Sequence, residues 1–364
     1  MGVPGPGNVD PAPAPGPGCL PCGLRGPPTL DLPSFRLPAH EEVRVKSFSH
    51  PHGLIMNDTR NYTTRIAATA PVVLSLATSL TGCDPASGPS LQELRSEVEA
   101  MIHESGAEVS VYYRDLAGPD SLLIAPDVRM HAASTMKVPV MIQLFLDRDA
   151  GLLSLEDSLE VTTTFSSIVD GSPYSLTPDS DSDSALYELE GQPVGYRHLM
   201  ELMITISSNL ATNILIQEVG AERVTATMRS LGADSIQVLR GVEDTPAFEA
   251  GLSNTTTARD LGIIMSALGR NEIGSPESAQ EMLEIMTRQQ WRSKIPALLP
   301  EGTRVAHKTG SITGINHDAG IVYPERGSPF ALVVLTRGFQ EREVAEAVAA
   351  RISRRIYDFQ MDKE

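Results

Sequence analysis

Strand patterns near both ends of the chain, with helical patterns between them, constrain the fold most strongly. Residues 107–116 and 121–126 carry β-branched and apolar residues on either side of the turn formers Gly118-Pro119-Asp120. Three more strand patterns follow late in the chain, at 304–309, 317–323 and 329–337. A sheet that unites strands from such distant segments predicts the α+β fold class.

Helical periodicity dominates the rest of the chain. In the last expected helix, Val344, Val348, Ile352 and Ile356 recur every four residues and so share one face. Residues 170–185 are rich in Asp, Ser and Pro, which predicts a loop. The expected helices cover residues 90–104, 134–149, 196–206, 209–219, 257–268, 276–288 and 341–358.

The first 55 residues differ in composition from the remainder. They contain 12 prolines and 8 glycines and show neither helical nor alternating periodicity, which predicts a disordered segment. From Met56 on, the sequence has the parts of a lipoprotein signal in the usual order. Two arginines come first, then an uncharged run over 66–82, which ends in the lipobox Leu80-Thr81-Gly82-Cys83. We expect Met56 to be the true start and residues 1–55 a non-native upstream extension. The alternative is a membrane anchor with a proline-rich cytoplasmic tail.

The signal over residues 56–83 predicts export and lipid attachment. Cleavage before Cys83 would make this cysteine the lipidated residue, residues 84–90 a short tether and residues 91–364 a single folded domain. The protein would then be anchored to a bacterial membrane, facing the periplasm or the cell exterior. We expect membrane contact through the lipid anchor only.

Charge, cysteine and histidine content exclude several functions. Lys plus Arg number 29 against 46 for Asp plus Glu, and the net charge of −17 argues against a nucleic-acid partner, which requires a basic surface. Cys19 and Cys22 form one isolated pair without the second pair of a zinc site. The histidines beyond Cys83 are scattered, so we expect no metal and no other cofactor. No long heptad pattern is present in the sequence, and we expect a monomer.

Ser134-Thr135-Met136-Lys137 is the first of three short motifs that could carry chemistry. If a helix opens here, the three-residue spacing places the Ser134 hydroxyl and the Lys137 amine on one face within hydrogen-bond range. The helix N-terminus favours a developing alkoxide, and a desolvated lysine can lose its proton and activate the serine. Taken alone, the motif also fits an ordinary surface serine and lysine.

Two further motifs follow at intervals of 73 and 99 residues. Ser207-Ser208-Asn209 lies between two expected helices and, taken alone, fits a helix cap. Lys308-Thr309-Gly310 lies on an expected strand, where a lysine and a hydroxyl can hold a carboxylate and the glycine permits close approach of a substrate backbone. Alone, this tripeptide is common in proteins.

In this order the three motifs are specific, because S-x-x-K, S-D-N and K-T-G form the set of serine β-lactamases and penicillin-binding proteins. Over residues 90–358 the chain resembles this superfamily, and within it class A β-lactamases. The resemblance implies a β-lactamase/transpeptidase-like fold. Its antiparallel sheet would draw on about 91–130 and 295–360, flanked by helices, with an all-helical subdomain over about 131–294.

The resemblance also implies residue roles. Ser134 would be the nucleophile, Lys137 would serve as or assist the acylation base, and Ser207 would pass a proton to the leaving nitrogen. Asn213 would brace the neighbouring loop, and the backbone N–H groups of Ser134 and Ser311 would form the oxyanion hole. The residues that would contact substrate are Asn209, Lys308, Thr309, Ser311 and the aromatic Tyr174, which also fits a plain surface tyrosine. Histidines 131, 307 and 317 receive no role.

Residues 239–261 resemble the family's Ω-loop but depart from its pattern. The family places a glutamate two residues after an arginine, and four residues later an asparagine that helps hold the deacylating water. Here Glu243 follows Arg240 by three residues, and Ala247 occupies the later position. Asn254 replaces the acidic residue that would pair with Arg240. Glu243 is the candidate deacylation base, with Asp244 and Glu249 as fallbacks, although all three carboxylates could simply solvate a loop.

This departure leaves three functions open. A β-lactamase hydrolyses its acyl-enzyme rapidly, whereas a D,D-peptidase-like penicillin-binding protein deacylates slowly, and a correctly placed carboxylate makes the difference. We favour a serine β-lactamase that acts on small-molecule β-lactams. The first alternative is a penicillin-binding protein that acts on D-Ala-D-Ala-type peptides. The second is a non-catalytic lipid-anchored binding protein, against which the complete Ser134, Lys137 and Lys308 set argues.

Overall fold

The computed structural model describes residues 90–363. The segments predicted over 1–55 and 56–83, the lipidation site at Cys83 and nearly all of the 84–90 tether therefore lie outside the described residues. Among residues 90–363, no helix is both long and apolar enough to span a membrane.

A five-stranded antiparallel sheet forms the centre of the fold and confirms the predicted α+β class. Its order is β2-β1-β11-β10-β9, so the early strands join the late ones where β1 pairs with β11, with Val111 opposite Val334. β9 is an edge strand. The bounds are Glu108–Asp115 (β1), Ser121–Ile124 (β2), Arg304–Ile312 (β9), Ile315–Tyr323 (β10) and Phe330–Arg337 (β11).

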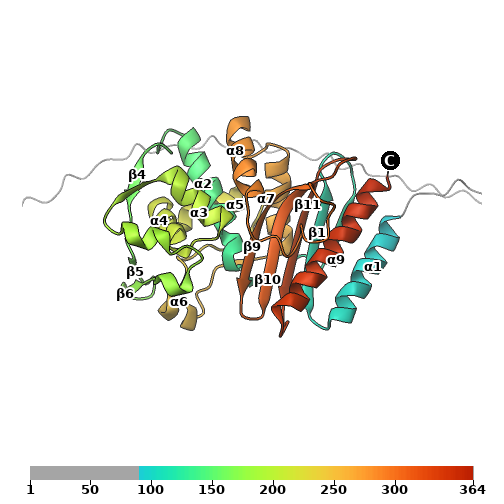
Figure 1. The fold of residues 1–364 in the computed structure, drawn as a ribbon, viewed down its shortest axis with the longest axis horizontal. Helices are drawn as coiled ribbons and strands as arrows, with labels where there is room; N and C mark the ends of the chain where they lie inside the picture. The colour runs from blue at the N-terminus through green and yellow to red at the C-terminus, as the bar shows by residue number, and fades with distance from the viewer. Residues whose placement is uncertain (1–89, 364) are drawn as a thin grey trace, which may run out of the picture. The chain divides into compact units, whose positions relative to one another are not determined.

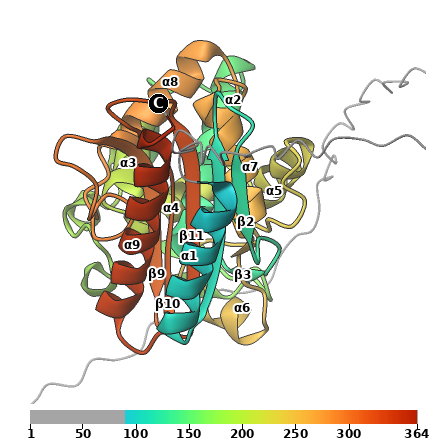
Figure 2. The same ribbon diagram turned by 90° about the vertical axis from the view of Figure 1, so that its right-hand side faces the viewer.

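Alternating side chains of each strand serve two separate cores. Val111 and Tyr113 of β1 pack beneath α1 (Leu91–Ser105) and α9 (Arg342–Met361), which lie side by side over one face of the sheet (Figure 2). Tyr112 points to the opposite face and contacts α7 (Ala258–Gly269). Gly262 of α7 permits this contact, because a Cβ there would lie 2.2 Å from the Tyr112 ring.

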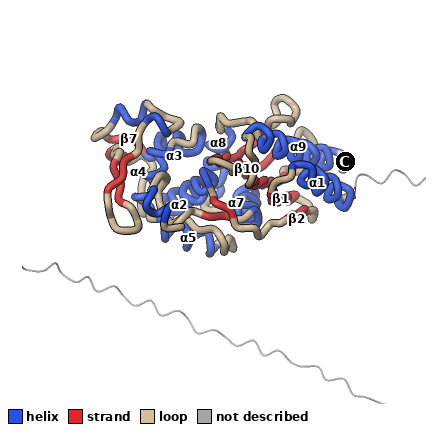
Figure 3. The backbone as a smooth tube through the Cα atoms, turned by 90° about the horizontal axis from the view of Figure 1, so that it is seen from below, coloured by secondary structure: helices blue, strands red, loops and turns tan. Residues whose placement is uncertain are grey.

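A group of helices adjoins the sheet on the α7 side (Figures 1 and 3). Their buried apolar side chains are continuous with the core beneath that face of the sheet. The helices are α2 (Lys137–Asp149), α3 (Tyr196–Thr205), α4 (Asn209–Val219), α5 (Ala221–Ser230) and α8 (Pro276–Thr287).

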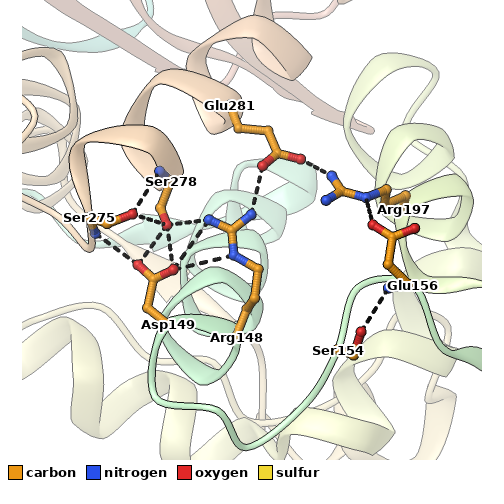
Figure 4. A network of polar contacts seen from close by, with 8 residues as sticks. All are labelled: Arg148, Asp149, Ser154, Glu156, Arg197, Ser275, Ser278 and Glu281. Carbon is orange, nitrogen blue, oxygen red and sulfur yellow. Dashed lines mark hydrogen bonds and ion pairs between the residues drawn. The ribbon is translucent and has the colours of Figure 1, made fainter.

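An ion-pair network joins α2, α3 and α8 at the C-terminus of α2, the end opposite Lys137 (Figure 4). Arg148 of α2 donates to Glu281 of α8 at 2.6 Å, and Glu281 also pairs with Arg197 of α3. Arg197 in turn donates to Glu156 at 2.8 Å, and Asp149 accepts from the backbone N–H of Ser275 at 2.8 Å. These contacts hold the C-terminus of α2 against α3 and α8.

Short elements complete the described part of the chain. The 170–185 segment, predicted as a loop, contains the short strand β6, which pairs with β5, and the 3₁₀ turn η2. The short elements are β3 (Met130–His131), η1 (Ala133–Met136), β4 (Ser158–Glu160), β5 (Thr164–Ser166), β6 (Pro173–Ser175), η2 (Pro178–Ser180), η3 (Ala185–Leu189), β7 (Pro193–Gly195), α6 (Thr245–Glu249) and β8 (Thr255–Thr256).

Three helices differ from the sequence prediction: α2 begins later than expected, and α5 and the five-residue α6 were not expected. The helix expected from Ser134 begins as an α-helix only at Lys137, after the 3₁₀ turn η1. Pro139 accounts for this, because a proline is tolerated in the first helical turn but would remove a hydrogen bond from the interior of a helix that began at Ser134. α5 is not among the expected helices, since only Val224 and Met228 give it an apolar stripe.

Candidate active site

The edge strand β9 lies directly against the turn η1, which carries Ser134. A Cβ at Gly310 would lie 2.9 Å from the Ser134 backbone nitrogen and 3.0 Å from that of Thr135. Glycine at this position therefore lets the sheet edge approach the backbone of η1 closely. The contact brings the first and third motifs together, although they are far apart in sequence.

A cavity of about 720 Å³ opens where η1, β9, the start of α4 and the 239–261 loop meet. Lys137 and Lys308 lie beneath it, each fully buried. The predicted site residues that line the cavity are Ser134, Ser207, Asn209, Glu243, Thr309 and Ser311. The structure thus brings together eight of the nine residues predicted for catalysis and substrate contact.

The amine of Lys137 is held by the second motif. It donates to the Ser207 carbonyl at 2.6 Å, to Ser207 Oγ at 3.2 Å and to Asn209 Oδ1 at 3.0 Å. Burial lowers the pKa of Lys137 to about 7, against the opposing charges of Asp181 and Glu243. This shift favours the neutral amine, which is the form that a proton acceptor requires.

Within residues 90–363, no hydrogen bond joins the side chains of Ser134 and Lys137, so the predicted direct contact between them is wrong for this structure. The reason is geometric: Ser134 lies in the tight 3₁₀ turn, and the Lys137 amine is taken up by oxygens of Ser207 and Asn209.

Ser207 is shared by the two buried lysines. Its Oγ accepts from Lys308 Nζ at 2.9 Å as well as from Lys137, and its backbone adopts a left-handed φ of 68°. Such a φ is uncommon outside glycine and often marks functional sites. Burial and the charge of Lys137 hold the pKa of Lys308 well below its ordinary value. The hydroxyl therefore lies where a proton can pass between the first and third motifs.

A third buried lysine, Lys294, was not predicted from the sequence. Its amine donates to Ser311 Oγ at 3.1 Å and lies 3.6 Å from Glu346, and burial lowers its pKa. It precedes β9 in a segment without periodicity, so only the tertiary structure shows that it reaches the end of the cavity.

Glu243 projects its carboxylate toward the second motif. Oε1 accepts from Asn209 Nδ2 at 3.0 Å, and Oε2 accepts from Ser180 Oγ at 3.1 Å. Its φ of 63° is left-handed, and its side chain is exposed in the cavity. Asn209 thus bridges Glu243 and Lys137 with the two ends of one amide.

The two fallback carboxylates are placed differently. Asp244 is buried, and its oxygens accept from Ser167 Oγ at 2.7 Å and from the N–H groups of Ile168 and Ala247 at 3.0 and 3.1 Å. It caps α6 and anchors the loop. Glu249 is exposed and is not among the residues that line the cavity. Glu243 is therefore the carboxylate available to a bound water.

Asn213 and Asn254 hold the 239–261 loop. Asn213 exchanges two hydrogen bonds with the backbone of Val242, at 2.7 and 3.0 Å, which confirms its predicted bracing role. Asn254 accepts from the N–H groups of Leu239 and Arg240 and donates to the Arg240 carbonyl. In the described chain Arg240 forms no ion pair, as expected, and its guanidinium donates to the Leu252 and Gly241 carbonyls.

Tyr174, the predicted aromatic wall, does not line the cavity. It lies on β6, with its ring 6.0 Å from that of Phe165 and its hydroxyl accepting from Asn213 Nδ2 at 3.3 Å. Pairing of β6 with β5 turns the ring into the hairpin, so the prediction for this residue is corrected. Phe248, Trp291 and Ile312 provide the large apolar side chains of the cavity instead.

The histidines near the third motif have structural contacts. Burial lowers the pKa of His317 to about 4, and its ring bonds the His131 carbonyl and the Thr336 N–H. His307 pairs with Asp318 at 2.9 Å, both fully buried. Among residues 90–363, no three His, Cys, Asp or Glu side chains are grouped to hold a metal ion.

Comparison with known proteins shows the family to which this chain belongs. The chain belongs to the beta-lactamase enzyme family, whose model matches residues 93–360. A β-lactamase of Streptomyces lavendulae is 27% identical over 265 residues, which cover 69% of this chain and 80% of that protein.

Solved structures extend the comparison to the fold. A β-lactamase from Sphaerobacter thermophilus DSM 20745 has a TM-score of 0.63 and 28% identity, covering 73% of this chain and 97% of that one. PBP-A has a TM-score of 0.64 and 26% identity, covering 75% and 98%. The β-lactamase/transpeptidase-like fold predicted from the motifs is thereby confirmed.

Proposed function

We propose that this protein is a serine β-lactamase that opens β-lactam rings through an acyl-enzyme on Ser134. The observation that carries the proposal is the arrangement of Lys137, Ser207 and Lys308 beneath the cavity, joined by hydrogen bonds of 2.9 to 3.2 Å at Ser207 Oγ. Around a reactive serine, this arrangement provides both a proton acceptor and a proton path.

The roles in acylation rest on the family resemblance as well as on geometry, since among the described residues the Lys137 amine is bonded to Ser207 and Asn209 and not to the Ser134 hydroxyl. Neutral Lys137 accepts the proton of Ser134 as Oγ attacks the lactam carbonyl, and the backbone N–H groups of Ser134 and Ser311 stabilise the oxyanion. The lactam C–N bond then breaks, and the leaving nitrogen takes the Ser207 proton. The protonated Lys137 replaces that proton across 3.2 Å. Lys308 and Thr309 hold the substrate carboxylate.

Deacylation is assigned to Glu243. Its carboxylate accepts a proton from a water that attacks the Ser134 ester, and the proton returns to Ser134 Oγ as the ester bond breaks. The hydrogen bonds from Asn209 and Ser180 support this role, since they hold both carboxylate oxygens at the cavity.

A chromogenic cephalosporin distinguishes the candidate functions. Sustained turnover by the purified protein supports the β-lactamase. One equivalent of product followed by a stall would favour a penicillin-binding protein, to which the likeness to PBP-A and the altered 239–261 loop also point. Fluorescent penicillin tests the third function. If it labels the wild type no more strongly than it labels Ser134→Ala, a non-catalytic binding protein is favoured.

We further propose that the protein is a monomer exported and lipid-anchored at Cys83. Support comes from the lipobox Leu80-Thr81-Gly82-Cys83 and from the substrate class, since β-lactams and D-Ala-D-Ala-type peptides occur outside the cytoplasm. Mass spectrometry of the native N-terminus tests this, and a peptide from residues 1–55 would contradict it. Sedimentation of the purified protein tests the monomer.

A further inference from the structure

The second motif lacks the carboxylate that its S-D-N pattern contains. Ser208 occupies the middle position, is fully buried, and uses its hydroxyl as the N-cap of α4 by accepting from the Ala211 N–H at 3.2 Å. A hydroxyl can satisfy this one donor. It cannot supply a negative charge at the start of α4, from which Asn209 reaches the cavity.

A carboxylate from elsewhere in the chain lies at this point. Asp181 follows η2, and its oxygens accept from the Asn209 N–H at 2.9 and 3.0 Å and from the Leu210 N–H at 2.8 Å. Tyr187 donates its hydroxyl to Oδ2 at 3.0 Å, and Ser208 Oγ lies 3.5 Å from the same oxygen. A negative charge is favourable at a helix N-terminus, where the first N–H groups have no partner within the helix.

We propose that Asp181 is a positioning residue that supplies this missing carboxylate from outside the motif, holding Asn209 and Ser207 against Lys137. The inference rests on the proposed serine hydrolase function. Asp181 fixes the backbone of Asn209, and the Asn209 side chain then reaches Lys137 at 3.0 Å and Glu243 at 3.0 Å. The neighbouring Ser180 holds the other oxygen of Glu243, so one short segment orients both the second motif and the candidate deacylation base.

The charge of Asp181 also acts on Lys137. Three charged groups from separate elements face this amine: Asp181, Glu243 of the 239–261 loop and Lys308 of β9. Burial lowers the pKa of Lys137, and the negative charge of Asp181 opposes this shift more strongly than that of Glu243. Removing the charge of Asp181 should therefore lower the pKa of Lys137 further.

The first test is Asp181→Asn, with Asp179→Asn as the matched control. Asn cannot accept from all of these donors, because one of its two ends is an NH₂ group. Asp179 is exposed, lies two residues away and makes no side-chain hydrogen bond within the described chain, so its change removes the same charge without the contacts. We expect acylation by a chromogenic cephalosporin to fall about 10- to 100-fold in Asp181→Asn only.

The pKa of Lys137, measured by NMR of ε-¹³C-labelled lysine without substrate, separates this inference from the proposed function. We expect it to fall in Asp181→Asn and to stay at the wild-type value in Asp179→Asn. An unchanged Lys137 pKa together with unchanged acylation would overturn the positioning role. Failure of the wild type to react with any β-lactam would instead overturn the proposed function. The pKa measurement would still decide whether Asp181 is a positioning residue.

A rescue variant guards against simple loss of folding. Ser208→Asp places a carboxylate inside the motif and keeps a capping oxygen. We expect it to impair the wild type, where it meets Asp181, and to restore acylation and the Lys137 pKa in the Asp181→Asn background. If Ser208→Asp is equally harmful in both backgrounds, Asp181 does not stand in for a missing motif carboxylate.

Discussion

Lys308 Nζ lies 2.9 Å from Ser207 Oγ, and through this hydroxyl the third motif is joined to the first. Removing the hydroxyl leaves Lys137 and Lys308 without their shared acceptor and, in the proposed mechanism, leaves the departing nitrogen without its proton donor. We expect Ser207→Ala to lower the acylation rate by roughly 10²- to 10⁴-fold, in the range of general acid–base effects. Stopped-flow measurement of cephalosporin opening checks this, and an unchanged melting temperature would show that the loss is chemical.

Glu243→Gln separates acylation from deacylation. The amide keeps the size of the side chain and one acceptor but cannot take a proton from water. We expect the burst of the first turnover to persist and the steady-state rate to fall by roughly 10²-fold or more. The matched control is Glu249→Gln, which alters an exposed glutamate of the same loop outside the cavity. Undiminished turnover in Glu243→Gln would remove Glu243 from the mechanism.

The pKa of Lys137 predicts a pH dependence for acylation. In the proposed mechanism the neutral amine is the active form, and burial lowers the pKa of Lys137 to about 7. The single-turnover acylation rate should therefore rise with pH through about 7 and reach a plateau above it. A rate that is flat between pH 5.5 and 8.5 would show that Lys137 does not titrate in the reaction.

The same shift makes Lys137 a pH-dependent cost to folding. Because its pKa is about 7 in the folded state and about 10.4 when unfolded, the unfolded chain binds more protons between these values, and this group's contribution to stability rises with pH. We expect Lys137→Met to gain stability relative to the wild type at pH 6.5 and to lose part of that gain by pH 9.5. Urea unfolding at the two pH values measures the difference.

The motifs fixed most of the site because their chemistry depends on residue type and order. Ser134, Lys137, Ser207, Asn209, Lys308 and Thr309 lie together as the resemblance implies. The strand and helix patterns likewise predicted the sheet, since a period of two or of about four residues reports directly on which side chains are buried.

What the sequence did not show depends on contacts between distant segments. Asp181 lies in a polar stretch that reads as a loop, and Lys294 lies in a segment without periodicity. Their roles depend on Asn209 and Ser311, which only the tertiary structure brings to them. The prediction that Tyr174 lines the cavity was wrong for a related reason. Its pairing with Phe165 in the β5–β6 hairpin depends on the folded structure and not on local composition.

Asn254 replaces an ion pair with backbone hydrogen bonds at the closure of the 239–261 loop. It is buried and satisfies two N–H groups and one carbonyl. Asn254→Ala leaves these groups unpaired, and since each buried unsatisfied group costs about 1–3 kcal/mol, we expect a loss of about 2 kcal/mol or more in the free energy of unfolding. Urea titration checks the loss. Deacylation should fall more than acylation, because this loop carries Glu243.

The exposed apolar side chains of the cavity predict substrate preference. Phe248 of α6 is 56% exposed, with its ring 6.4 Å from that of His131, three residues before Ser134. Ile312 ends β9, two residues after Gly310, and is 43% exposed. A large apolar acyl substituent on the β-lactam would cover these side chains, and burial of such surface gains roughly 25 cal/mol per Å².

We therefore expect Phe248→Ala to lower kcat/KM about tenfold for a penicillin with an aromatic acyl group, within the range for one lost apolar contact in a pocket. For 6-aminopenicillanic acid, which has no acyl group, kcat/KM should change little. Leu252→Ala, an exposed apolar residue of the same loop that does not line the cavity, is the matched control. An equal loss for both substrates would mean that Phe248 supports the loop and does not contact the acyl group.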